Sequence, residues 1–223
     1  MQKIQLLSIT AIFIAIVFAS DAVNAQTDIP AIEMVSVEGN AYVKSFDIGK
    51  YEVTQGQWKA VMGSNPSHFQ SGDNYPVEMV SWDDIQEFIS KLNDATGKNY
   101  RLPTMDEWDY ASRGGNKSGG HRFSGSNEIE NVAWYSVNSG GKTHPAGTKA
   151  PNELGIYDMN GNVFEWCEDV LPSRDSRGRA IEVRLVRGGG WSSVPAYADL
   201  STNPNYWQST MRFNNLGFRL VHQ

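Results

Sequence analysis

The segment GIYDMNGNVFEWCEDV, residues 155–170, places acidic side chains on both sides of a tight turn. Asp158 and Glu165 bracket an Asn-Gly-Asn sequence, in which Gly161 gives the backbone freedom to turn carbonyl oxygens inward. Calcium prefers about six to eight oxygen ligands from carboxylates, carbonyls and water, so this segment could hold the ion. The same residues also suit an ordinary Asx-turn with surface acids. The spacing alone leaves both interpretations open.

The residue types give less support to a reactive thiol, a phosphate-binding loop or a transition-metal site. Cys167 is the only cysteine, and the neighbouring acids would disfavour its thiolate, so we expect a buried, unreactive side chain. The glycine run at 188–190 lacks the lysine and the strand–helix context of a phosphate-binding loop. The histidines lack the spacing of a transition-metal site; they are His68, His121, His144 and His222.

The beginning of the chain is typical of a cleavable secretion signal. Lys3 gives a basic start, residues 4–19 are almost wholly apolar, and residues 23–25 form a small-x-small cleavage pattern. The apolar run is shorter than the roughly 20 residues of a membrane span, although an uncleaved anchor is the alternative. The expected organisation is a signal peptide at 1–25, a short mature leader at 26–33 and one domain at 34–223.

The amino-acid composition bears on the partners of the expected exported domain and on what stabilises its fold. The net charge is −6 and no run of lysine and arginine occurs, which gives no electrostatic footprint for nucleic acid. A single cysteine excludes an internal disulfide, so we expect a stable core, with a metal as a possible addition, to hold the fold together.

Three helix starts and two strands are predicted in the first half. Residues 34–39 and 41–53 alternate apolar with polar, and the Gly39-Asn40 pair would form the turn between them. Thr54, Ser81 and Thr104 each suit an N-cap. The expected ends of the three helices are Gly63, Gly97 and the Gly114-Gly115 pair.

Regular periodicity fades after residue 115. Residues 114–222 are rich in Gly, Asn and Ser with scattered aromatics, which predicts long, packed loops without a domain boundary. Two of the tryptophans, Trp58 and Trp108, each lie one turn into a capped helix, and we expect both in the core.

Several blocks together resemble the sulfatase-modifying-factor family, the domain of formylglycine-generating enzymes and their bacterial relatives. The blocks are GKYEVTQGQW, PVEMVSWDDI, YRLPTMDEWDYASRGG, NELGIYDMNGNVFEW, RLVRGGGW and NNLGFRLV, in the family's order over about residues 34–221. The implied fold is a single α/β (α+β) domain, a variant of the C-type lectin fold with long loops.

The resemblance also implies particular metal sites. It implies structural calcium held by the Asp158 and Glu165 carboxylates and by the Gly161 and Val163 carbonyls. A second family calcium site begins at a pair that resembles Asn131-Val132, but its downstream segment is shorter here.

The copper site of the oxidases is not matched. The family's copper cysteines fall on Ser193 and near Ala198, and two thiolates are what selects Cu(I), so copper is not expected. The aromatics of the 193–213 segment offer a contact surface instead, and the core is their alternative place. We single out Tyr197, Tyr206 and Trp207, with Phe213 beside them.

These features favour a periplasmic or secreted, calcium-stabilised domain that binds a protein or glycan partner and performs no oxidation. The alternatives are a formylglycine-generating oxidase, another periplasmic peptide-modifying enzyme of the family, and a structural subunit of an envelope assembly. A scaffold alone does not decide between them.

Overall fold

The structure is a computed structural model that describes residues 29–202 and 204–223; the predicted signal peptide and residues 26–28 of the leader lie outside this range. A small antiparallel sheet brings together distant parts of the chain, in the order β1-β2-β7. Its strands are β1 (Met34–Val37), β2 (Phe46–Gly49) and β7 (Val221–His222). No helix in the described part of the chain is long and apolar enough to cross a membrane.

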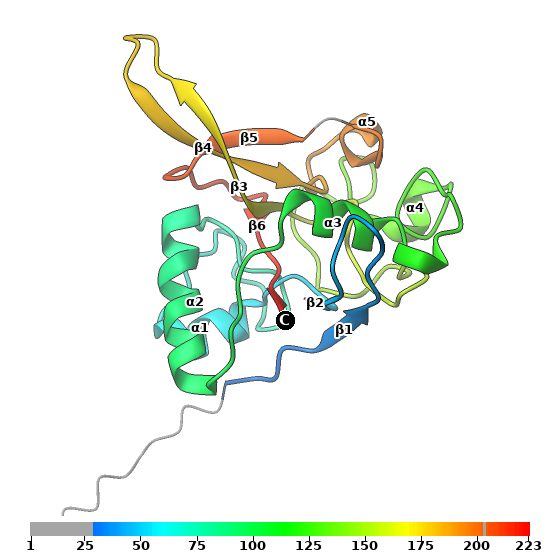
Figure 1. Cartoon of the computed structure of the whole chain (residues 1–223), viewed down its shortest axis with the longest axis horizontal. Coiled ribbons are helices and arrows are strands. Elements are labelled where there is room, and N and C mark those ends of the chain that lie inside the picture. The colour runs from blue at the N-terminus through cyan, green and yellow to red at the C-terminus, as the bar shows by residue number, and fades with distance from the viewer. Residues whose placement is uncertain (1–28, 203) are drawn as a thin grey trace, which may run out of the picture.

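A second sheet carries the longest strands, in the order β5-β4-β3-β6. It is built from β3 (Phe164–Arg174), β4 (Ala180–Arg187), β5 (Asn205–Gln208) and β6 (Leu216–Gly217). β3 and β4 form an antiparallel hairpin with a bulge between Trp166 and Val170, and β6 lies parallel to β3. The far end of this hairpin projects from the body of the molecule (Figure 1).

The three predicted helices are confirmed with their capping boxes. They are α1 (Gln55–Met62), α2 (Trp82–Thr96) and α3 (Met105–Ser112), with N-caps at Thr54, Ser81 and Thr104. Two short helices, α4 (Ile129–Val132) and α5 (Pro195–Ala198), and the 3₁₀ turn η1 (Gly115–Lys117) lie in the loops. α1 and α2 end at glycines in the left-handed region, Gly63 and Gly97, whereas α3 ends earlier than predicted, with Arg113 as its C-cap.

Two predictions about strands were wrong in extent. The turn between β1 and β2 runs from 38 to 45, because the Asn40 Oδ1 accepts the backbone N–H groups of Tyr42 and Val43 and so bends the chain into a wider loop. Residues 164–187, predicted as loops, form the β3–β4 hairpin. The bulge interrupts the alternation of apolar and polar residues along β3, and the distal half of the hairpin is exposed on both faces. The sequence therefore has no regular apolar pattern that would predict these strands.

The core has two main clusters, and each contains one of the tryptophans predicted to be buried. Trp58 stacks on Phe88 of α2 with ring centroids 5.0 Å apart. Trp108 of α3 lies in the second cluster beside Cys167. Both indoles are nearly inaccessible, with 3% and 1% of their surfaces exposed, so their placement in the core is confirmed.

Candidate functional site

The acidic turn lies deep inside the protein. Asp158 is only 2% exposed and adopts a positive φ of 60°. Its Oδ2 accepts the backbone N–H of Gly147 at 2.6 Å, while its buried Oδ1 has no partner among the described residues. Burial raises the pKa of the Asp158 carboxyl to about 6, although the Gly147 hydrogen bond and the charge of Arg219 act in the opposite direction. Asp158 is therefore an incompletely satisfied buried acid.

Glu165 has a different environment, since both its oxygens are partnered. Arg219 donates to Glu165 from Nη2 to Oε1 at 2.6 Å and from Nε to Oε2 at 2.7 Å, and neither side chain is exposed. Trp108 Nε1 donates to the same Oε2 at 2.7 Å. Arg219 also donates to the carbonyls of Gly49 and Tyr157, so it ties β2 and the acidic turn to β3.

A third buried acid, Glu52, completes the cluster. Its oxygens accept Asn162 Nδ2 at 2.8 Å and the Val163 N–H at 3.1 Å. Burial, and then the negative charges of Asp158 and Glu165, raise the pKa of Glu52 well above its ordinary range. Three carboxyl groups therefore share one guanidinium. A buried excess of negative charge is neutralised either by protons or by a bound cation.

In the part of the chain that the structure describes, three of the four predicted calcium ligands have no hydrogen bond that would compete with a cation. The carbonyls of Gly161 and Val163 accept no hydrogen bond from the described residues, and the Asp158 Oδ1 is free as well. Glu165 would have to share its carboxylate with Arg219. No three His, Cys, Asp or Glu side chains of residues 29–202 and 204–223 converge to hold a metal, but the predicted set needs only two carboxylates.

The backbone of the turn depends on a glycine. A Cβ at Gly161 would lie 2.3 Å from the carbonyl oxygen of Trp134, a distance that no side chain can adopt. The neighbouring Asn162 has a positive φ of 65° and donates from its backbone N–H to that same Trp134 carbonyl at 2.8 Å. The turn is therefore held against the loop at 134 by close backbone contact, which positions Asp158 and Val163 on either side of it.

The positions of the copper cysteines carry no metal-binding groups. The Ser193 hydroxyl is buried and accepts the Gly190 N–H at 3.0 Å, and Ala198 is 1% exposed. Cys167, the only thiol, is fully buried away from solvent. Burial, and then the charge of Asp169, raise the pKa of its thiol well above the ordinary range. Its burial in the core is as expected, and its lack of reactivity stays a prediction.

An open cleft lies beside Ser193. We call it the aromatic cleft; its volume is about 320 Å³ and its lining residues are Phe164, Ser192, Ser193, Val194, Tyr197, Asn205 and Trp207. Tyr197 is 52% exposed, and Val194 is 50% exposed. Trp207 is only half-buried and packs edge-on against Phe164, with ring centroids 5.3 Å apart. The cleft therefore combines a fixed aromatic floor with exposed rims.

Tyr206 lies on β5 between Asn205 and Trp207, which both line the cleft, so its side chain points to the opposite face of the sheet. It is 59% exposed there. Trp207 packs against Phe213 with ring centroids 5.1 Å apart. Of the predicted contact residues, Tyr197 and Trp207 line the cleft together, and Tyr206 does not line it. The alternative expectation is that these aromatics lie in the core. Only Trp207 meets it in part, because it packs against the first core cluster.

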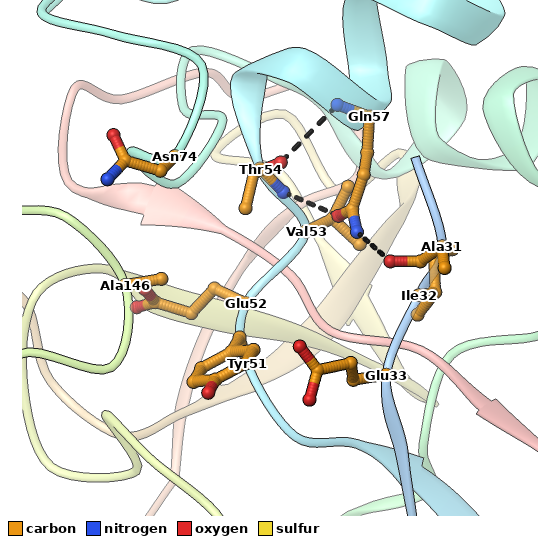
Figure 2. A pocket seen from close by; sticks show the side chains of 10 residues that line it. All are labelled: Ala31, Ile32, Glu33, Tyr51, Glu52, Val53, Thr54, Gln57, Asn74 and Ala146. Atoms are coloured by element: carbon orange, nitrogen blue, oxygen red, sulfur yellow. Dashed lines mark hydrogen bonds between the residues drawn. The ribbon is translucent and has the colours of Figure 1, made fainter. Parts of the chain in front are cut away.

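A second pocket, of about 310 Å³, opens at the start of α1 (Figure 2). The Thr54–Gln57 capping box forms one wall, and Gln57 Nε2 donates to the Ala31 carbonyl at 3.1 Å across it. Glu33 and Tyr51 lie on the opposite side in this view. The pocket is a gap between the leader segment and the body, and its two acids pair with groups outside it, Glu33 with Lys50 and Glu52 with Asn162.

Sequence reasoning missed two contributors to the acidic cluster. Arg219 lies within the NNLGFRLV block, where a charge inside an apolar run is a signal for a buried pair. Glu52 gave no such signal, because an acid in an alternating strand pattern normally faces solvent. The structure instead turns it inward at the end of the loop that follows β2.

Comparison with known proteins gives the family of the chain. The model of the sulfatase-modifying factor enzyme 1-like domain matches residues 23–223. The chaperone protein LppX of Paenibacillus barcinonensis is 36% identical over 232 residues, covering 76% of this chain and 82% of LppX. The formylglycine-generating enzyme of Streptomyces coelicolor is 29% identical, covering 74% of this chain but only 58% of that enzyme.

A mammalian relative and a solved structure extend the comparison. The inactive C-alpha-formylglycine-generating enzyme 2 of Bos taurus is 30% identical, covering 65% of this chain and 49% of that protein. The structure of Treponema denticola variable protein 1 superimposes with a TM-score of 0.71 at 28% identity, covering 86% of this chain and 92% of that one. The fold is thus a single α+β domain of the formylglycine-generating-enzyme type, and the chain belongs to the sulfatase-modifying factor enzyme 1-like family.

Proposed function

We propose that this protein is a non-oxidase member of its family that binds a protein partner through the aromatic cleft, in the periplasm or outside the cell. The observation that carries the proposal is the cleft itself. It opens beside Ser193, where the oxidases would hold copper, and its rim exposes Val194 and Tyr197. Half-exposed aromatics over a packed floor are typical of the central contacts of protein interfaces.

A protein partner is the more specific form of this proposal. Ser192 and Ser193 each accept one hydrogen bond, from Asn215 Nδ2 and the Gly190 N–H respectively, and the remaining lining includes Phe164, Val194, Tyr197 and Trp207. The relative named as a chaperone supports a protein partner as well.

Calcium forms part of this proposal as a structural ion. The free Asp158 Oδ1 and the free carbonyls of Gly161 and Val163 would ligate it, with Glu165 shared with Arg219. The ion would neutralise the excess charge of the buried cluster and so stabilise the folded protein by mass action. No chemical step is assigned to it.

The binding proposal is tested by site-specific photo-crosslinking in the producing cells. A benzophenone amino acid at position 197 should yield one dominant covalent product, whereas the same group at the fully exposed Tyr42 should not. The product, identified by mass spectrometry and purified, should bind wild-type protein, and Tyr197→Ser together with Val194→Ser should weaken that binding by about tenfold or more, because both side chains are exposed at the rim of the cleft. Equal crosslinking from both positions would refute the cleft as the binding site.

The oxidase alternative has its own test. The purified protein is titrated with Cu(I), and oxygen uptake is followed with a cysteine-containing peptide as substrate. We expect neither stoichiometric copper binding nor conversion of the thiol to an aldehyde, because a hydroxyl and a methyl group replace the two thiolates. Turnover above the metal-only control would overturn the non-oxidase proposal.

A further inference from the structure

The distal part of the β3–β4 hairpin, residues 170–184, has few neighbours except at its base, where Val183 and Arg184 pair with β5 and the Arg184 guanidinium lies 3.7 Å from the centre of the Trp82 ring. β6 pairs with β3 only at Phe164 and Glu165, and β5 pairs with β4 only from Val183 to Val186. No other described strand flanks residues 170–182, which project beyond the rest of the sheet (Figure 1). We call residues 170–184 the distal hairpin. A two-stranded ribbon exposed in this way contributes little to the stability of a domain, so its length calls for another explanation.

The charge of the distal hairpin is opposite to that of the protein. It holds four of the ten arginines of the chain, Arg174, Arg177, Arg179 and Arg184, against two acids. Its net charge is therefore +2, while the whole chain carries −6 and the remainder must carry −8. A local concentration of charge opposite to the net charge favours an acidic partner at this end of the molecule.

Two of these arginines are free to bind an external group. Arg179 pairs with Asp175 and Arg184 pairs with Glu182, each at 2.6 Å. Arg174 donates only to the Gly178 carbonyl, and Arg177 makes no ion pair with any described residue. A guanidinium presents a planar set of donors that matches a carboxylate. The free pair thus offers two carboxylate sites near the tip of the hairpin.

Apolar side chains lie next to the arginines, further from the tip. Val170 is 51% exposed and Leu171 is 40% exposed. A shallow hollow of about 410 Å³ follows them, lined by Pro172, Ser173, Arg174, Ala180 and Ile181. In the β3–β4 register Val170 and Pro172 share a face of the ribbon with Arg174, whereas Leu171 lies on the other face. One face therefore presents apolar side chains and then an arginine.

This order of side chains distinguishes between classes of partner. A flat anionic membrane would meet the tip first, and the tip sequence Asp175-Ser-Arg-Gly-Arg179 has no apolar residue to insert. Backbone pairing along the open edge of β3 is also disfavoured, because Pro172 has no N–H to donate. A polypeptide that lies along this face can place apolar side chains over Val170 and the hollow and carboxylates over the arginines.

We propose that the distal hairpin is a second docking surface that binds an acidic, partly apolar segment of a protein partner through its side chains. This inference goes beyond the aromatic cleft and does not depend on it. Arg174 and Arg177 hold carboxylates, while Val170 and the hollow hold apolar side chains.

The test uses a defined probe, a fluorescein-labelled eight-residue peptide that alternates Glu with Leu and Phe. Fluorescence anisotropy at low ionic strength should show binding to the full-length mature protein. R174E together with R177E should weaken the binding by about tenfold or more, because two attractive contacts become repulsive. The matched control is K44E with K142E, which makes the same charge change at two exposed lysines that have no ion pair among the described residues, and it should bind like the wild type.

Control peptides, a cleft variant and a vesicle experiment separate this inference from its alternatives. The peptide with Lys in place of Glu should not bind, and Tyr197→Ser in the aromatic cleft should leave binding of the acidic peptide intact. No binding by the wild type, or equal loss in both charge variants, would overturn the inference. Flotation with vesicles of 30% phosphatidylglycerol in phosphatidylcholine that depends on Arg174 and Arg177, without peptide binding, would overturn it in favour of a lipid surface. Circular dichroism and melting curves show that each variant is folded.

Discussion

Glu165 and Arg219 form a two-bonded ion pair, at 2.6 and 2.7 Å, in which neither side chain reaches solvent. Glu165 lies at the start of β3, and Arg219 lies between β6 and β7. The pair therefore connects the two sheets, and Trp108 of α3 joins it through its indole N–H. It is the central polar contact of the fold, and several consequences can be measured.

Removal of the Arg219 guanidinium should strongly destabilise the folded protein. Arg219→Met leaves Glu165 buried without its counter-charge, and we expect a loss of about 3–5 kcal/mol in the free energy of unfolding. Urea denaturation followed by tryptophan fluorescence gives this value. Arg212→Met is the matched control, because Arg212 pairs with Asp84 at the surface, where side-chain exposures are 47% and 31%; it should lose less than about 1 kcal/mol. Equal losses would show that burial does not determine the strength of the pair.

Calcium should raise the melting temperature of the wild type, and EDTA should lower it. At a free calcium concentration of about 100 times Kd, the gain is about 2.7 kcal/mol. Asp158→Asn should abolish the response, since the free carboxylate oxygen becomes part of a neutral amide, and Asp94→Asn on the exposed side of α2 should retain it. A wild type that ignores both reagents, with no calcium by elemental analysis, would exclude the proposed ion and leave protons to neutralise the cluster.

Glu78 should make stability depend on pH. It is fully buried, one of its oxygens accepts the Phe69 N–H, and the other has no partner among the described residues. Burial raises the pKa of Glu78 above its ordinary 4.5, although the hydrogen bonds from Phe69 and His68 act against this shift. The folded state thus holds the proton more tightly than the unfolded state does. The contribution of Glu78 to stability is full below about pH 4.5 and is lost as the pH rises through the raised pKa.

The measurement for Glu78 is the free energy of unfolding from pH 4 to 8 in wild type and Glu78→Gln. The amide does not titrate, so the variant should show a weaker decline of stability with rising pH. Parallel curves for the two proteins would mean that Glu78 has the same pKa in the folded and unfolded states. Glu87→Gln, on the exposed surface of α2 beside Lys91, is a suitable control and should leave the slope unchanged.

The thiol of Cys167 should not react with Ellman's reagent in the native protein. It is fully buried and its pKa is raised, so Ellman's reagent should react only after unfolding in guanidinium chloride. Ser176→Cys at the exposed tip of the hairpin supplies a reactive reference, which should be labelled within the first minutes. Rapid labelling of the wild type would show that the core around Trp108 opens readily.

The sequence allowed the capped helices to be predicted because their signals are local. A threonine or serine, an acceptor three residues later and a terminal glycine fix α1 and α2 without reference to the rest of the chain. The family blocks allowed the fold type to be predicted. The acidic cluster could be predicted only in part, because Glu52 and Arg219 reach Asp158 and Glu165 from opposite ends of the domain. Such distant contacts leave no spacing that can be counted.

The β3–β4 hairpin also could not be predicted, because contacts with distant residues shape it. Its bulge at 167–169 is held by groups from elsewhere: Trp82 Nε1 donates to the Cys167 carbonyl, the Glu168 N–H donates to Pro103, and Asp169 accepts the Met105 N–H. None of these partners is local, so the strand's alternation is interrupted for reasons that the strand itself does not contain. The metal ligands predicted from the family stay a prediction.

Residues 216–222 complete both sheets at once, with β6 beside β3 and β7 beside β2, and Arg219 lies between them. During synthesis this segment is added after the strands that it joins. Neither sheet is complete and the carboxylates of the core have no guanidinium until then. The two sheets are therefore completed together, by a segment whose arginine lies 54 positions beyond its partner Glu165.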